Sequence, residues 1–188
     1  MVSRFYITYK YRGKVIRMHP LFHPLYIEYC SYFNGNRDYF ECHEVLEEYW
    51  KEIAPGEKRH ALVGYIQVAT GLYHWRRGNY RGAQRMLQNA KMIFEQLPHE
   101  QFIFVEKINF EQFKKQISDT IEHLTQHHTF LPFHLSIIDE KLQQLVNEHS
   151  FSVPTLDANY LMHKHTLRDR SDVIAERLAN LKARNNSL

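Results

Sequence analysis

The residues best suited to chemistry lie in one short segment, Glu41–Trp50, which reads Glu-Cys-His-Glu-Val-Leu-Glu-Glu-Tyr-Trp. At about 100° per residue on a helix, His43, Glu44 and Glu47 project from one edge of an apolar stripe. An imidazole and a carboxylate at positions i and i+4 have the spacing that two metal ligands on one helix require. The segment therefore indicates either a divalent-metal site or a general acid/base site.

A second polar group is expected within the apolar helix predicted for about residues 57–77. Gln67 and His74 are seven residues apart, so they share one stripe of that helix, and Gly71 between them allows a close approach. If the two helices pack antiparallel after the Pro-Gly turn, this stripe can face the edge that carries His43, because buried carboxylates need compensating partners. We therefore expect one polar pocket between the two helices.

The first interpretation of this pocket is an enzyme active site. In it, His43, Glu47 and His74 hold a divalent cation of unknown identity. Glu44 is then the catalytic base, and Gln67 orients substrate or water. No nucleotide cofactor is expected, and the substrate is an unknown small molecule.

The second interpretation is a non-catalytic interaction module whose histidine, glutamate and glutamine side chains form a structural hydrogen-bond network. A protein partner would then bind the aromatic and arginine-rich exterior around Trp75, Tyr80 and Arg81, or the C-terminal helix. Spacing alone favours this network over catalysis, because Glu47 stands where the His-Glu-x-x-His pattern of zinc proteases needs a second histidine. Both interpretations stay open at this point.

The apolar periodicity predicts an all-α protein, a helical bundle built on a central helical hairpin. A short helix is expected at 25–33, followed by an acidic helix to about Ile53 that Asn36 or Asp38 caps. Gly78 and Asn79 should form the turn between the apolar helix and a helix at 80–95. Further helices are expected after Asn109, after a capping box at Ser136 and Asp139, and at about 171–184, with Phe102–Val105 extended.

Three regions are expected along the chain. Residues 1–17 form an accessory N-terminal arm, with alternation that also suits a short strand or hairpin. Residues 18–97 form the helical core domain, and residues 98–188 form a C-terminal helical extension packed on that core. The motif residues all fall in the core domain.

The composition limits the classes of partner. The 188 residues are 44% hydrophobic and 24% charged, with a formal net charge of +3, as expected of a globular protein. The mild charge does not favour a nucleic-acid partner, and no apolar run suits a membrane span, while a homo-oligomer is compatible with the sequence. Cys30 and Cys42 lack Cys-x-x-Cys spacing and the first residues do not follow a secretory pattern, so we expect a cytoplasmic location.

Several segments resemble one known family. Phe33-Asn34, Tyr39–Trp50, Ile66–Ala69 and His74–Ala83 resemble the domain of unknown function 309 family, small all-helical bacterial and archaeal proteins sometimes labelled metal-dependent hydrolases. The resemblance covers about residues 25–97, and the C-terminal helices resemble an extension of Bacillus-type members. It implies a helical bundle with the motif residues Glu41, His43, Glu44, Glu47, Trp50, Gln67, His74 and Asn79. The residues expected to bind substrate or support the metal ligands are Glu41, Trp50, Gln67, Arg76, Arg77 and Asn79.

Overall fold

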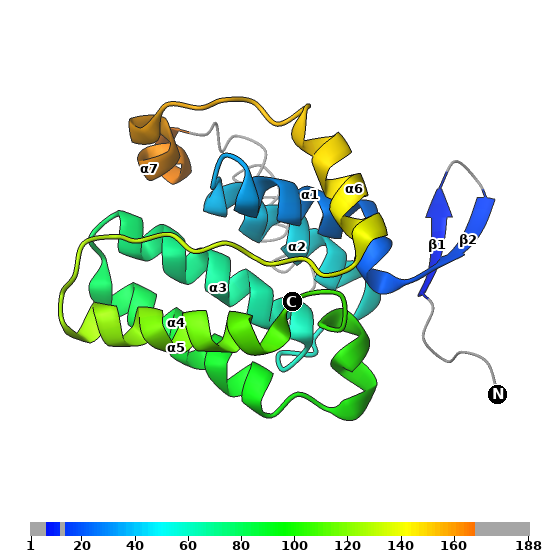
Figure 1. Cartoon of the computed structure of the whole chain (residues 1–188), viewed down its shortest axis with the longest axis horizontal. Coiled ribbons are helices and arrows are strands. Elements are labelled where there is room, and N and C mark those ends of the chain that lie inside the picture. Colours follow the sequence, from blue (N-terminus) through cyan, green and yellow to red (C-terminus); the bar gives the residue numbers. More distant parts are fainter. Residues whose placement is uncertain (1–6, 12–13, 168–188) are drawn as a thin grey trace, which may run out of the picture.

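The computed structural model describes residues 7–11 and 14–167, and this part is predominantly helical (Figure 1). The predicted all-α class is confirmed. The helices of the described part are α1 Pro24–Asn34, α2 Tyr39–Ile53, α3 Ala61–Arg76, α4 Tyr80–Glu95, α5 Phe110–Thr125, α6 Glu140–Ser150 and α7 Ala158–Leu167, with 3₁₀ helices η1 Pro20–Phe22 and η2 His99–Phe104.

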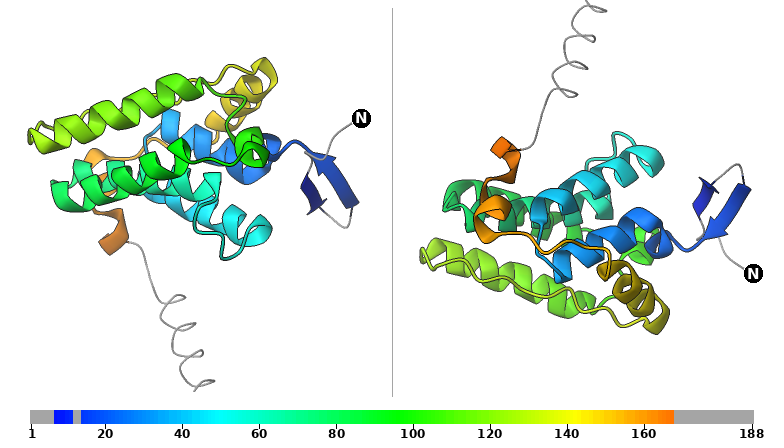
Figure 2. Two further views of the ribbon diagram at one scale, coloured as in Figure 1. Left: turned by 90° about the horizontal axis from the view of Figure 1, so that it is seen from below. Right: turned by 90° about the horizontal axis from the view of Figure 1, so that it is seen from above.

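The N-terminal hairpin is also confirmed. Strand β1 (Ile7–Tyr11) pairs antiparallel with strand β2 (Lys14–Met18), with Ile7 opposite Met18. Both views of Figure 2 show the hairpin projecting from one end of the bundle. The motif residues lie on helices that begin after it, so the hairpin does not contribute to their placement.

Helix α3 is the central element of the bundle, as its apolar sequence predicts. It packs against α2 on one side and α4 on another, while α5 packs on α4 and α6 on α1 (Figure 1). Leu62, Tyr65, Val68 and Leu72 of α3 are fully buried. Each such side chain stabilises the fold by about 1.5–3 kcal/mol relative to exposure, so α3 fixes the positions of its neighbours.

Two glycines of α3 let α4 come close. A Cβ atom at Gly64 would lie 2.6 Å from the Phe94 ring, and one at Gly71 would lie 2.8 Å from Leu87 Cγ. Contacts this short are not tolerated in a packed core. The close approach predicted at Gly71 is therefore that of a leucine side chain from α4, and it serves helix packing.

Within residues 14–167, histidines cap helices at three points. The Nδ1 atoms of His19, His23 and His60 each accept a hydrogen bond from the backbone N–H two residues on, at 3.2, 3.3 and 3.2 Å. Histidine is not among the usual N-cap residues, so sequence patterns do not mark these starts. The predicted start of the apolar helix near Glu57 is wrong for this reason, since α3 begins at Ala61 after the His60 cap.

The more familiar caps are confirmed. The side chains of Asp38, Asn79 and Asn109 each accept from the backbone N–H three residues on, at 3.1, 2.9 and 3.2 Å. Gly78 follows α3 with a φ of 70°, a left-handed conformation that glycine adopts without strain. Asn79 and Gly78 thus form the predicted turn into α4.

Two local predictions in the C-terminal half are wrong. Phe102–Val105 is not extended, because His99–Phe104 forms η2. Ser136 does not cap a helix: its carbonyl accepts from the Asn109 N–H at 2.8 Å, and Asp139 alone caps α6. The helix predicted at 171–184 lies outside the described residues. No helix in the described ranges has the length and apolar character needed to cross a membrane.

Candidate functional site

The predicted chemistry-bearing side chains of α2 do lie together. His43 Nδ1 is 3.0 Å from Glu44 Oε1, and His43 Nε2 is 3.4 Å from Glu47 Oε2. One ligand-type atom from each of the three residues lies within 4.8 Å of the others. The side chains are about one-third exposed, at 33, 35 and 35%, so solvent reaches the group. We call His43, Glu44 and Glu47 the His43 group.

A lysine one turn further along already balances part of the negative charge. Lys51 Nζ lies 2.8 Å from Glu47 Oε1, the oxygen that does not face His43. Lys51 is 63% exposed, so this pair is weak and easily exchanged. The group therefore combines an imidazole and two carboxylates, donors that suit Zn²⁺ and other divalent transition metals.

Helix α2 packs against α3, and two contacts mark the ends of the edge that faces it. Near one end of this contact the rings of Phe40 and Tyr73 are 5.9 Å apart. At the other end, Trp50 Nε1 donates to the Glu57 carbonyl at 3.2 Å, in the loop that leads into α3. Because Phe40 and the His43 group share one helix edge, helix geometry places the group beside the contact of α2 with α3, and a pocket shared with α3 stays a prediction.

The structure does not bring His74 into the His43 group. His74 Nδ1 instead lies 3.2 Å from Asn79 Nδ2, so the imidazole accepts a hydrogen bond from the side chain that caps α4. Burial, and then the charge of Arg77, lower the pKa of His74. This histidine is therefore tied to the α3–α4 turn, and it is not among the ligand-type atoms of the His43 group.

Gln67 lies on the partly exposed strip of α3 that also carries His74, but it faces α4. It lines a cavity with Asn89 and Gln96, and its Oε1 atom is buried without a hydrogen-bond partner among the described residues. Helix periodicity placed Gln67 and His74 on one stripe correctly. It could not show that Gln67 faces α4.

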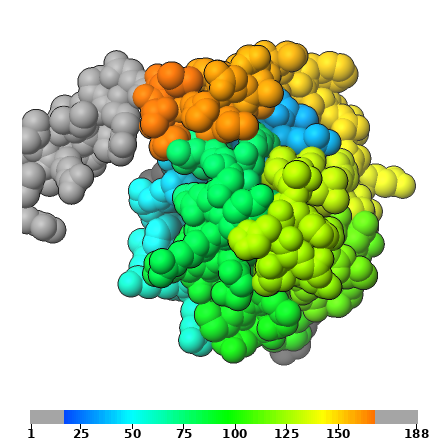
Figure 3. All heavy atoms as spheres, turned by 90° about the vertical axis from the view of Figure 1, so that its left-hand side faces the viewer, coloured from blue at the N-terminus to red at the C-terminus, as the bar shows by residue number. Residues whose placement is uncertain are grey.

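Glu41, a motif residue, belongs to a buried ion cluster that sequence analysis missed. Lys164 of α7 bonds to Asp38 Oδ2 and lies 2.8 Å from Glu41 Oε1. Asp38 and Lys164 are 1% and 8% exposed. Burial lowers the pKa of Lys164, but hydrogen bonds to Asp38 and Glu41 outweigh this effect and raise it. The cluster joins α7 to the start of α2, and α7 lies against the bundle surface (Figure 3).

Replacing Lys164 with methionine should lower the free energy of unfolding by about 2 kcal/mol. The variant leaves two carboxylates without their cation, which costs about 3–5 kcal/mol in a fully buried setting, but local release of α7 limits the loss. Urea unfolding measures it. Lys115→Met, which removes an exposed pair with Asp119, should change stability by less than about 0.5 kcal/mol. Equal effects of the two substitutions would show that the cluster adds nothing.

Arg76 and Arg77, which were expected to bind substrate or support the metal ligands, contact aromatic rings rather than the His43 group. The Arg76 guanidinium lies 4.6 Å from the Tyr39 ring centroid and 5.2 Å from that of Phe130, and it donates to a loop carbonyl. The Arg77 guanidinium lies 5.4 Å from the Tyr73 ring centroid. Both cations stabilise the packing of α3 with its neighbours.

The prediction that Trp75 lies on an exterior partner-binding surface is wrong. Trp75 is only 2% exposed, and its Nε1 donates to the His128 carbonyl at 3.1 Å. A tryptophan near a turn is easily taken for a surface residue, because the segment that covers it lies more than fifty residues further along the chain. Trp75 is therefore a core residue.

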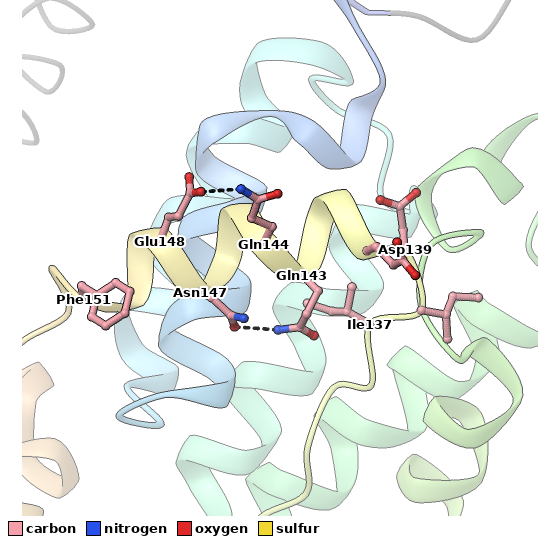
Figure 4. A pocket seen from close by; sticks show the side chains of 9 residues that line it. Ile137, Asp139, Gln143, Gln144, Asn147, Glu148 and Phe151 are labelled. Atoms are coloured by element: carbon pink, nitrogen blue, oxygen red, sulfur yellow. Dashed lines mark hydrogen bonds between the residues drawn. The ribbon is translucent and has the colours of Figure 1, made fainter.

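A hollow of about 410 Å³ runs along α6, far from the motif residues in sequence (Figure 4). Its amide side chains bond to neighbours on the same helix: Gln143 to Asn147 and Gln144 to Glu148, both at 2.8 Å. Figure 4 shows Phe151 at the opposite end of the helix from Asp139. Since these polar groups satisfy one another instead of converging, the hollow is a weaker candidate than the His43 group.

The fold and the His43 group define a class of protein: a small helical bundle with one imidazole between two carboxylates on an open helix edge. The chain belongs to the family described as Domain of unknown function (DUF309), whose sequence model matches residues 26–86. It is 37% identical over 174 residues to the uncharacterized protein YpuF of Bacillus subtilis (strain 168), covering 86% of this chain and 96% of that protein. No solved structure matches significantly. The family resemblance seen in the sequence is confirmed.

Proposed function

We propose that this chain is a metal-dependent hydrolase whose cation-binding residues are His43 and Glu47. The observation that carries the proposal is the close approach of three ligand-type atoms within 4.8 Å on one accessible helix edge. One imidazole and a carboxylate one turn apart form a chelating pair, and their partial exposure lets water reach them. A divalent cation bound there would act as a Lewis acid that activates water near neutral pH.

In this proposal Glu44 holds the imidazole in position. When the Nδ1–H group of His43 donates to Glu44 Oε1, the Nε2 lone pair is directed toward Glu47, where a cation would be shared. Glu44 is also the candidate proton acceptor, since it is the carboxylate of the group that need not bind the cation. We further propose a cytoplasmic location, which the free, buried Cys30 and Cys42 support, and a small-molecule substrate.

The test is metal binding by protein purified without an affinity tag and stripped with chelator. Calorimetric titration with Zn²⁺ and with Mn²⁺ should show one saturable site per chain, and the bound cation should raise the melting temperature. The loaded protein should then hydrolyse a chromogenic ester or phosphoester faster than the stripped protein. No saturable binding of either cation would contradict the proposal.

A second candidate function, a non-catalytic interaction module, is favoured by a different observation. Glu41 pairs with Lys164, Trp50 donates to a loop carbonyl, and Asn79 caps α4, so these motif residues have structural partners. A motif that only stabilises the bundle would show no change in melting temperature on adding cation or chelator. The same titration therefore separates the two candidates.

A further inference from the structure

A cavity of about 340 Å³ lies between the first half of α3 and the second half of α4. Met92 and Ile93 of α4 give it an apolar wall, and Pro98 closes one side. Its size is at the lower end of the range for small-molecule sites. None of the His43 group lines it, so it is separate from the proposed metal site.

The mouth of the cavity is positively charged. Lys58 and Arg59, from the loop before α3, line it, and the described lining residues include no carboxylate. Arg59 Nη1 reaches across to Gln96 Oε1 at 3.5 Å, which uses one of the five N–H donors of the guanidinium. A guanidinium fork beside an ammonium group favours a carboxylate or a phosphate.

The inner part of the cavity presents amide groups. Gln67 and Asn89 face it from α3 and α4. The Gln67 Oε1 atom is buried without a donor among the described residues, and an unsatisfied buried acceptor costs about 1–3 kcal/mol. A turn of the Gln67 amide about its last side-chain torsion would bring this oxygen to the cavity, where a ligand O–H or N–H group removes that cost.

We infer that this cavity binds a small organic anion with an apolar body, whose acidic group contacts Lys58 and Arg59 and whose hydroxyl or amine donates to Gln67. The three parts of the site each recognise one part of such a molecule. The cations select the charge, the Met92 and Ile93 wall selects the apolar body, and the buried amide oxygen selects the donor.

The inference is tested with three matched probes. Binding of 4-hydroxyphenylacetate, phenylacetate and 4-hydroxyphenylacetamide to ¹⁵N-labelled full-length protein is followed by NMR titration. The first has the anion, ring and hydroxyl, the second lacks the hydroxyl, and the third lacks the charge. We expect 4-hydroxyphenylacetate to bind about tenfold more tightly than either of the others, with the largest shifts at Gln67 and Asn89 signals.

Paired variants distinguish the cavity from general charge attraction. The double variant Lys58→Gln and Arg59→Gln should raise the Kd of 4-hydroxyphenylacetate about tenfold. Because both side chains are exposed, this variant should still fold. The control, Arg81→Gln with Arg85→Gln, removes the same charge from exposed positions of α4 outside the cavity. Equal weakening by both pairs, or no saturable binding of 4-hydroxyphenylacetate, overturns the inference. Because the probes need no metal, a failure here is distinct from failure of the proposed hydrolase.

Discussion

Glu47→Gln is expected to weaken binding of Zn²⁺ or Mn²⁺ by more than about 100-fold, or nearly 3 kcal/mol. The substitution keeps the shape of the side chain but removes the charge that faces His43 Nε2 at 3.4 Å. Glu44→Gln should have a smaller effect, about 10-fold, because Glu44 contacts the other imidazole nitrogen and acts through His43. Calorimetric titration of the stripped variants measures both changes.

The matched control for these variants is Glu48→Gln. Glu48 is exposed on the same helix but is not in the His43 group, so its loss removes one negative charge without removing a ligand. Affinity should then change by less than about threefold, as expected for a screened surface charge. If the three glutamine variants bind cations equally, the attraction is a general property of an acidic helix and the site does not exist. The free energy of unfolding without metal separates the metal site from the structural network. If Glu44 belongs to a hydrogen-bond network, Glu44→Gln should lower it even in the absence of a cation.

Acidification from pH 7 to pH 5 is expected to lower the free energy of unfolding by about 4 kcal/mol through His23 and His60. Burial lowers the pKa of each from 6.5 to about 4. Below pH 6.5 the unfolded chain therefore takes up protons that the folded chain does not, so stability is full above pH 6.5 and falls as the pH drops toward 4. At pH 5 each histidine contributes a loss of about 2 kcal/mol.

The hydrogen bonds of these two histidines reinforce the effect. In each, Nδ1 accepts the backbone N–H that begins a helix, and a protonated nitrogen can no longer accept. His60→Asn keeps an acceptor at this position, because the asparagine oxygen can cap the helix. The variant should be less stable at pH 7, since it loses buried ring contacts, but its urea midpoint should depend less on pH. Parallel pH curves for the variant and the natural chain would assign the acid sensitivity to other groups.

The sequence predicted the edge of α2 well because that edge is a local feature. His43, Glu44 and Glu47 are within five positions of each other, and helix periodicity alone brings them together. The direction of the α3 stripe was harder to predict. Gln67 and His74 share a face, but the rotation of α3 is decided by Gly64 and Gly71 packing on α4, which no repeat in the sequence encodes.

Long-range pairings could not be predicted from periodicity. Lys164 and Asp38 are 126 positions apart, and a lone lysine on a short helix gives no sign that it is buried. The same holds for the phenol of Tyr73, which lies 2.9 Å from His165 Nδ1. The histidine caps were missed for another reason. Histidine Nδ1 can accept the capping hydrogen bond in place of a serine or aspartate oxygen, but it does so too rarely for a histidine to predict a helix start. Such features appear only when the chain is folded.

The link between Lys164 and the first turn of α2 has a consequence for any shortened form of this protein. A chain cut before position 164 would lose the ammonium group that Asp38 and Glu41 share, in addition to the residues removed. Two neighbouring carboxylates at the entrance to α2 would then repel each other, only a few residues from His43. Loss of stability in such a truncation would report on an electrostatic defect within the core and would not by itself reveal a role for the deleted residues.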